Sequence, residues 1–300
     1  MLLVTGITGH TGTYFLEELI KYNYSNPIRV LVRDSTNTTK LESSPLNMEI
    51  VRGDLNDKES LQQVIKGVES IIHIYNIHHS QMIVEEALRH NVKKVVLVHT
   101  TGVYSKFKEA SENYKQIERN IEELLQRSDI NMEVIILRPA MIYGDLCDHN
   151  ISKFIKLIDR FKFIPVIDKG ENLIQPVNAR DLGKAYYHAL VYANDRQDFD
   201  LTGDRPIQLR ELFHLISKQL NKRIYIINVP STLGVIIAKI IKIITFKKFD
   251  YVEKVQRMTE NRSYSHEKAK RVFNYQPMSI EEGIQIEVGQ YLDKKRGKKK

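Results

Sequence analysis

The sequence has few of the features that mark secreted, metal-binding or membrane-spanning proteins. Its one cysteine, Cys147, excludes an internal disulfide framework and fits a reducing compartment. His78 and His79 alone do not make a metal site, and no other metal-ligand spacing is present. A buried strand is predicted to begin at Leu2 and leaves no room for a signal peptide. We therefore expect a cytoplasmic protein without a bound metal.

Long hydrophobic runs are also missing. The most apolar stretch, Leu233–Phe246, is too short to span a membrane and is interrupted by Lys239 and Lys242. The spacing of these lysines predicts an amphipathic helix in a lobe of the protein. Two alternatives stay open, contact with a membrane interface and contact with a partner protein in a structural subunit. Membrane contact is not expected to be its main role.

Charge of one sign is concentrated at one end of the chain. The formal net charge is +8, but residues 293–300 hold six basic residues and one acid, so the rest is only weakly basic. We expect this end to be a solvated, disordered basic tail, and we expect no specific nucleic-acid partner. The remaining chain is long and apolar enough for one large α/β domain with an added lobe.

A strand, a glycine-rich turn and a helix are predicted over Leu2–Leu19. Gly6 would permit the tight turn after the strand, Gly9 would let the main chain approach a pyrophosphate, and Gly12 would let the helix pack closely. The helix N-terminus would add free N–H donors for phosphates. The turn therefore predicts a dinucleotide site, whose contacts would come from Gly6, Thr8, Gly9, His10, Thr11 and Gly12.

The order of several motifs resembles the short-chain dehydrogenase/reductase superfamily, in its extended or atypical, NAD-dependent epimerase/dehydratase-like branch. They are T-G-x-x-G-x-x-G at 5–12, G-D-L at 53–55, L-R-P-x-x-x-Y-G at 137–144 and a closing Y-Q-P-x-S-x-E-E-G at 275–283. The resemblance implies an α/β fold, a doubly wound parallel Rossmann sheet with a small C-terminal substrate lobe. Residues 1–145 would form the NAD(P)-binding domain, 146–292 would complete the sheet and form the lobe, and 293–300 would be the tail.

Cofactor choice is predicted from the end of the second strand, Ile28–Val32. An acid there bonds a ribose 2′-hydroxyl, whereas an arginine accommodates a 2′-phosphate, so Arg33 favours NADP over NAD, although Asp34 is adjacent. Asp54 is either an adenine-side contact or a helix cap. The resemblance implies further cofactor contacts from Asp54, Leu55, Ile74, Tyr75 and Pro139. His73, on an apolar strand, is expected to be a core residue.

The catalytic candidates follow from the resemblance. Thr100 stands where the family has a hydroxyl that polarises the reacting carbonyl, and Tyr114 stands where it has the general acid/base. Glu118 replaces the lysine that the family places four residues after this tyrosine, and a carboxylate there would repel a phenolate. The substrate candidates are Thr101, Met141 and Gln175.

Two functions stay open on the sequence. The first is an NAD(P)-dependent oxidoreductase or epimerase/dehydratase-like enzyme, acting on a sugar nucleotide or a related small carbonyl or hydroxyl compound. The second is a non-catalytic NADP(H)-binding sensor or scaffold, which Glu118, Tyr75 and Met141 favour. The oligomeric state also stays open, with a homodimer as one option.

Overall fold

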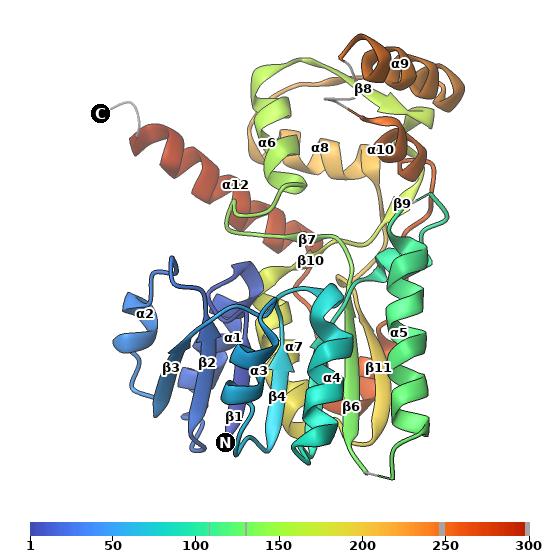
Figure 1. The fold of residues 1–300 in the computed structure, drawn as a ribbon. Helices are drawn as coiled ribbons and strands as arrows, with labels where there is room; N and C mark the ends of the chain where they lie inside the picture. Colours follow the sequence, from blue (N-terminus) through green and yellow to red (C-terminus); the bar gives the residue numbers. More distant parts are fainter. Residues whose placement is uncertain (108, 130, 246–249, 298–300) are drawn as a thin grey trace.

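A computed structural model describes residues 1–107, 109–129, 131–245 and 250–297. Its centre is a seven-stranded parallel sheet with the strand order β11-β6-β5-β4-β1-β2-β3 (Figure 1). The strands are β1 (Leu2–Thr5), β2 (Ile28–Val32), β3 (Met48–Arg52), β4 (Ser70–His73), β5 (Lys94–Val98), β6 (Glu133–Pro139) and β11 (Arg196–Leu201). This arrangement confirms the doubly wound Rossmann sheet.

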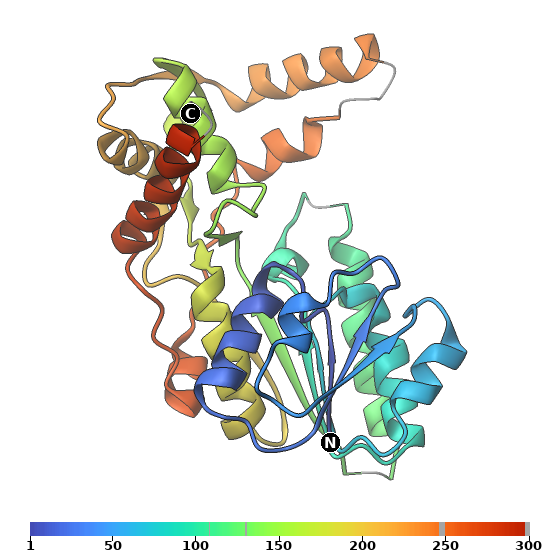
Figure 2. The same cartoon turned by 90° about the vertical axis from the view of Figure 1, so that its left-hand side faces the viewer.

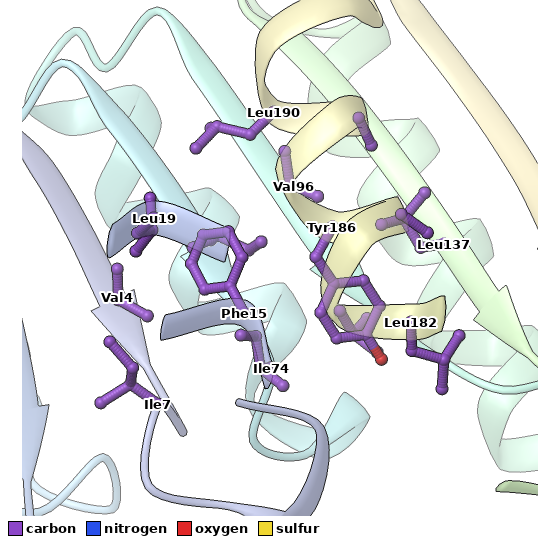
Figure 3. Packing of buried hydrophobic residues seen from close by; sticks show 14 of the residues in the cluster. Val4, Ile7, Phe15, Leu19, Ile74, Val96, Leu137, Leu182, Tyr186 and Leu190 are labelled. Atoms are coloured by element: carbon purple, nitrogen blue, oxygen red, sulfur yellow. The ribbon is translucent and has the colours of Figure 1, made fainter. Parts of the chain in front are cut away.

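Helices cover both faces of the sheet because its central strands are apolar on both sides. One face carries α1 (His10–Lys21), α7 (Ala179–Tyr192) and α11 (Glu267–Phe273), and the other carries α3 (Lys58–Val64), α4 (Ser80–Arg89) and α5 (Ser111–Gln126) (Figure 2). Two buried cores result. Figure 3 shows part of the first, where Phe15 of α1 and Tyr186 of α7 are fully buried near Val96 and Leu137 of the sheet.

A smaller lobe lies beyond the carboxyl ends of the strands (Figure 1). The chain leaves the sheet after β6 and later returns to it through α7 and β11. The lobe has its own core, which includes Ile155, Phe213 and Ile284. Its elements are α6 (Ile151–Arg160), β8 (Phe163–Ile167), α8 (Leu209–Gln219), β13 (Tyr225–Val229), α9 (Ser231–Ile244), α10 (Val252–Arg257) and α12 (Ile280–Gly297).

Short elements connect the two parts. β7 (Ile142–Tyr143) pairs with β10 (Val177–Asn178), and β9 (Leu173–Ile174) pairs with β12 (Ile207–Gln208). The remaining short helices are α2 (Thr39–Glu42), η1 (Ile77–His79), η2 (Thr101–Tyr104) and η3 (Asp168–Gly170).

The expected disordered tail is wrong for residues 293–297, which lie in α12. Two contacts explain the longer helix. Lys295 forms an ion pair with Asp159 of α6, and the Tyr291 hydroxyl donates to Asp159 Oδ2 at 2.8 Å. Arg296 lies 3.7 Å from Asp293, one helical turn earlier. The last three lysines lie outside the described residues.

The apolar run predicted as a helix is α9. Phe246, at its end, lies outside the described residues. Among the helices that the structure describes, none is long and apolar enough to cross a membrane.

Candidate cofactor and substrate site

The turn between β1 and α1 is packed so closely that it requires glycine at two positions. Gly6 has a φ of +82°, and a Cβ there would lie 2.8 Å from the Tyr75 nitrogen. A Cβ on Gly12 would lie 2.2 Å from the Gly6 carbonyl oxygen and 2.8 Å from Ile7. Gly12 therefore seats α1 against the turn, as the sequence predicted. Gly9 stands at the N-cap of α1 and has no side chain to bond the first turn's N–H groups.

A groove of about 440 Å³ lies beside this turn. It contains ten of the twelve predicted cofactor residues, namely Gly6, Thr8, Gly9, His10, Thr11, Arg33, Asp54, Leu55, Ile74 and Tyr75. The groove is also lined by seven residues that were not among the predicted cofactor contacts, namely Thr5, Leu31, Val32, Thr36, Gly53, Asn56 and Ile142. Gly12 and Pro139 do not line it. A glycine turn that opens into a groove at a helix N-terminus fits the diphosphate of a dinucleotide.

Arg33 and Thr36 line the groove just after β2, where a Rossmann sheet receives the adenosine ribose. Arg52 Nη1 donates to the backbone carbonyl of Asp34 at 2.7 Å, and Asp34 does not line the groove. The cap of α3 is Asp57, whose carboxylate accepts from the backbone N–H groups of Glu59 and Ser60. Asp54 is therefore not that cap, and its side chain lies at the groove.

His10 lines the groove but is also bound to the segment that follows β7. Its Nε2 lies 2.9 Å from the Gly144 carbonyl oxygen and 2.8 Å from Asp145 Oδ1. The Tyr14 hydroxyl donates to Asp145 Oδ2 at 2.9 Å, and burial raises the pKa of that hydroxyl. These contacts bind the segment at Gly144 and Asp145, just after β7, to α1. The sequence analysis missed Tyr14 and Asp145, because their partnership joins residues far apart in the chain.

A second cavity of about 300 Å³ lies between the sheet and the lobe. Four predicted residues line it, and they are Thr100, Thr101, Met141 and Gln175. Ile142 lines both this cavity and the cofactor groove, so the two adjoin at that residue. The predicted site residues that line a cavity therefore form two sets, one around the cofactor groove and one around the neighbouring cavity.

The polar side chains of the second cavity differ in how they are bound. Thr100 Oγ1 accepts from the Gly102 N–H at 3.0 Å, which leaves its O–H proton for a ligand. Thr101 instead donates to the Pro139 carbonyl oxygen at 3.3 Å. The Gln175 amide donates to the Gly203 carbonyl oxygen at 2.8 Å and accepts from the Tyr264 N–H at 3.2 Å. Gln175 thus joins the segments at Gly203 and Tyr264 in the wall of the cavity.

Two arginines, Arg257 and Arg262, also line this cavity. Their Nε atoms are buried and find no hydrogen-bond partner within the described part of the chain. Burial, together with the positive charge of Arg257, lowers the pKa of Arg262, although an arginine remains charged at neutral pH. Sequence reasoning missed both residues, because they belong to no motif. Arg257 is about a quarter exposed and its Nη1 lies 3.7 Å from Glu253 Oε1, so each arginine keeps one unsatisfied Nε donor rather than a free guanidinium. Two partly buried cations with unsatisfied Nε donors suit an anionic group.

Tyr114 lies on the face of α5 that packs toward η1. Its ring centroid is 5.6 Å from that of His78, and Tyr114 lines neither the groove nor the second cavity. Tyr114 and Thr100 therefore do not line the same cavity. Its catalytic role stays a prediction.

Glu118 is engaged in a buried ion pair with Arg138. Arg138 donates from Nε at 3.0 Å and from Nη2 at 2.8 Å, and His99 Nδ1 lies 2.9 Å from the same carboxylate. Burial alone would raise the pKa of Glu118, but the hydrogen bonds from His99 and Arg138 outweigh it and hold that pKa at about 2. The expectation of an uncompensated carboxylate that repels a phenolate is therefore corrected, since Arg138 balances its charge.

His73 is fully buried. Its ring nitrogens lie 2.6 Å from Thr5 Oγ1 and 2.8 Å from the Asn76 carbonyl oxygen. Burial lowers the pKa of His73 to about 4, so the ring is neutral at physiological pH. The structure places His73 in the core at the end of β4, beside Thr5 of β1, as expected.

The parallel sheet, the glycine turn and the groove at its carboxyl edge together define a dinucleotide-binding Rossmann protein. Comparison with known proteins makes this class more specific. Residues 6–152 match the family described as NAD(P)H-binding. The chain therefore contains an NAD(P)-binding Rossmann domain, and its motifs and fold resemble those of the extended, epimerase/dehydratase-like branch of the short-chain dehydrogenase/reductase superfamily.

Individual relatives are distant. A sterol-4-alpha-carboxylate 3-dehydrogenase (decarboxylating) from Dictyostelium discoideum is 22% identical, covering 71% of this chain and 74% of the relative. The dTDP-glucose 4,6-dehydratase DesIV of Streptomyces venezuelae, solved with NAD bound, is 20% identical with a TM-score of 0.74, covering 98% of both chains. A UDP-glucose 4-epimerase from Thermotoga maritima is 17% identical with a TM-score of 0.72, covering 98% of this chain and 99% of the other.

Proposed function

We propose that this protein is an NADP-preferring oxidoreductase of the epimerase/dehydratase type, and that its substrate is a small carbonyl or hydroxyl compound bearing an anionic group. A nucleotide sugar is the first candidate for that compound. One observation carries the proposal. The cavity that adjoins the cofactor groove is lined by Thr100, whose hydroxyl proton is free, and by Arg257 and Arg262, whose buried Nε donors have no partner within the described residues.

The residues divide the work by their chemistry. When bound, the nicotinamide cofactor supplies a hydride acceptor or donor. Thr100 would donate a hydrogen bond to the oxygen of the reacting carbon, and Arg257 and Arg262 would bind the anionic group at the other end of the cavity. Charge-assisted hydrogen bonds from arginine suit a diphosphate, and they suit a carboxylate equally well.

The substrate class can be tested by binding and turnover. Purified protein with NADPH or NADP is offered UDP-glucose, dTDP-glucose and a carboxylated hydroxysterol, the last because one relative is named for such a substrate. We expect turnover of an anionic compound, and Arg262→Met should raise its KM at least about tenfold by removing a charged hydrogen bond. Arg119→Met, on the exposed face of α5, is the matched control and should leave KM unchanged. Equal KM values for Arg262→Met and the unaltered protein would contradict the anionic site.

NADP preference is proposed from the groove itself. Of the adjacent residues Arg33 and Asp34, Arg33 lines the groove and Asp34 does not, and an arginine at this place favours a ribose 2′-phosphate. Calorimetric titration with NADPH and NADH measures this preference directly. Tighter binding of NADH would reverse it.

A second function, a cofactor-binding sensor or scaffold without turnover, is favoured by the position of Tyr114. Tyr114 lines neither the groove nor the second cavity. The position four residues later, where the resemblance implies a lysine that assists the tyrosine, is Glu118, and Glu118 is paired with Arg138. Thr100→Val and Tyr114→Phe separate the two functions. Nucleotide binding with no turnover on any substrate, unchanged by both variants, would support the sensor.

A further inference from the structure

Helix α9 (Ser231–Ile244) has its small residues inside and its large apolar residues outside. Gly234 and Ala238 are the buried residues of this helix. Gly234 packs so closely on Ile167 that an added Cβ would lie 2.6 Å from the Ile167 side chain. The helix is therefore attached to the lobe by its narrow side, and its wide side faces away from the protein.

The outward side is a continuous apolar stripe. Six large side chains recur with a spacing of three or four residues, each between 44% and 74% exposed, and they are Leu233, Ile236, Ile237, Ile240, Ile243 and Ile244. Large aliphatic residues of this kind are normally buried, and a contiguous exposed group of them marks a contact surface. We call these six residues the α9 stripe.

The size of the helix limits what the α9 stripe could enter. Its 14 residues span roughly 21 Å, less than the ~30 Å hydrocarbon thickness of a bilayer. The helix therefore cannot cross a membrane, but it can lie parallel to the surface with the stripe among the headgroups and the upper acyl chains.

The charges near the α9 stripe favour a lipid surface over a second copy of the chain as its partner. No acidic residue occurs from 231 to 249, whereas Lys239, Lys242, Lys247 and Lys248 do, the last two outside the described residues. Lys239 is exposed, and Lys242 lies 2.5 Å from Asp250. Two copies pairing through the stripe would bring lysines together, whereas anionic headgroups would neutralise them.

We propose that α9 is an interfacial docking helix, which holds the lobe against a bilayer containing anionic lipids. The α9 stripe would enter the surface, and Lys239, which is exposed beside it, would contact the headgroups, whereas Lys242 is paired with Asp250. α10, which follows α9 in the chain and includes the cavity residue Arg257, would then lie near the same surface (Figure 2). This docking does not depend on which substrate the cavity accepts.

Vesicle co-sedimentation of the full chain tests the docking. We expect the protein to pellet with phosphatidylcholine vesicles that contain phosphatidylglycerol, and to pellet weakly with phosphatidylcholine alone or at high salt. Replacing Ile236, Ile240 and Ile243 together by Gln should lower the bound fraction at least about tenfold. Lys239→Gln should lower the partition coefficient about fivefold.

A matched variant controls for the loss of any exposed apolar residue. Ile20, Val191 and Val272 are exposed large residues outside the lobe, and their joint replacement by Gln should leave vesicle binding unchanged. Circular dichroism and NADPH binding confirm that both triple variants fold. Equal losses for the two triple variants would overturn the proposal.

A tryptophan reporter gives a second readout, because the chain has no tryptophan of its own. Ile243→Trp should show a blue-shifted emission on adding anionic vesicles, and Tyr192→Trp, at an exposed position of α7, should not. Absence of both pelleting and emission shift would overturn the proposal. Sedimentation velocity tests the alternative, in which a second copy of the chain covers the α9 stripe. A dimer that is lost in the triple isoleucine variant, in a protein that does not bind vesicles, would assign the stripe to that second copy.

Discussion

Glu287 of α12 should make the stability of this protein fall as the pH rises. Its side chain is fully buried, its Oε2 accepts from the Gly144 N–H at 3.2 Å, and its carboxyl group is hydrogen-bonded to that of Asp148. Burial, followed by the hydrogen bond and charge of Asp148, raises the pKa of Glu287 to about 9. At neutral pH Glu287 is therefore protonated, and its carboxyl O–H is the donor available for a hydrogen bond to Asp148.

The sign of the effect follows from proton linkage. The unfolded chain releases this proton near its ordinary pKa of 4.5, whereas the folded protein keeps it up to about 9. The folded state binds more protons in this window, so the free energy of unfolding decreases with rising pH and levels off above it. Because one pKa unit corresponds to about 1.4 kcal/mol, we expect a loss on the order of 2 to 3 kcal/mol between about pH 6 and pH 8.

Glu287→Gln removes this titration and keeps a donor for Asp148. Urea denaturation of both proteins at several pH values measures the free energy of unfolding. The variant should show a flatter dependence and be the more stable protein at pH 8 by about 2 kcal/mol. Glu282→Gln, an exposed position on the same helix, is the control and should follow the unaltered protein. Parallel curves for Glu287→Gln and the unaltered protein would refute the reasoning.

Three further variants test the site and its support. Gly12→Ala should cost about 1 to 3 kcal/mol and abolish NADPH binding, since the added methyl overlaps the Gly6 carbonyl, whereas Gly289→Ala, in open space on α12, should be neutral or stabilising in a thermal melt. Arg33→Ser should weaken NADPH binding at least about tenfold by calorimetry and leave NADH binding unchanged. An equal loss of affinity for both nucleotides would contradict a 2′-phosphate contact from Arg33. Glu118→Ala should cost about 3 kcal/mol in urea denaturation because Arg138 loses its bidentate partner, and a change within the error of the assay would show that the ion pair contributes little.

The sheet and the cofactor groove were predictable because their signals are local. Strands buried on both faces appear as short apolar runs such as Leu2–Val4, and a backbone turn that excludes Cβ atoms requires glycine at fixed positions. Both properties can be seen in single stretches of the chain. Ten of the predicted cofactor residues therefore meet at one groove.

The residues that were missed, or given the wrong environment, depend on distant partners. Glu118 is balanced by Arg138, twenty residues later on another element. The last helix extends to Gly297 because Asp159, on α6, binds Tyr291 and Lys295. No periodicity within one segment reports such a pairing.

The positive charge that lines the second cavity comes from residues that follow α9, and not from the sheet domain. The family's lysine on the fifth helix is here Glu118, and the arginine of the L-R-P segment, Arg138, is neutralised by it. Arg257 and Arg262, which follow α9 in the chain, are the cations that line the cavity beside Thr100. An anionic substrate would therefore contact the sheet domain through Thr100 and the lobe through Arg257 and Arg262, on the two sides of the cavity.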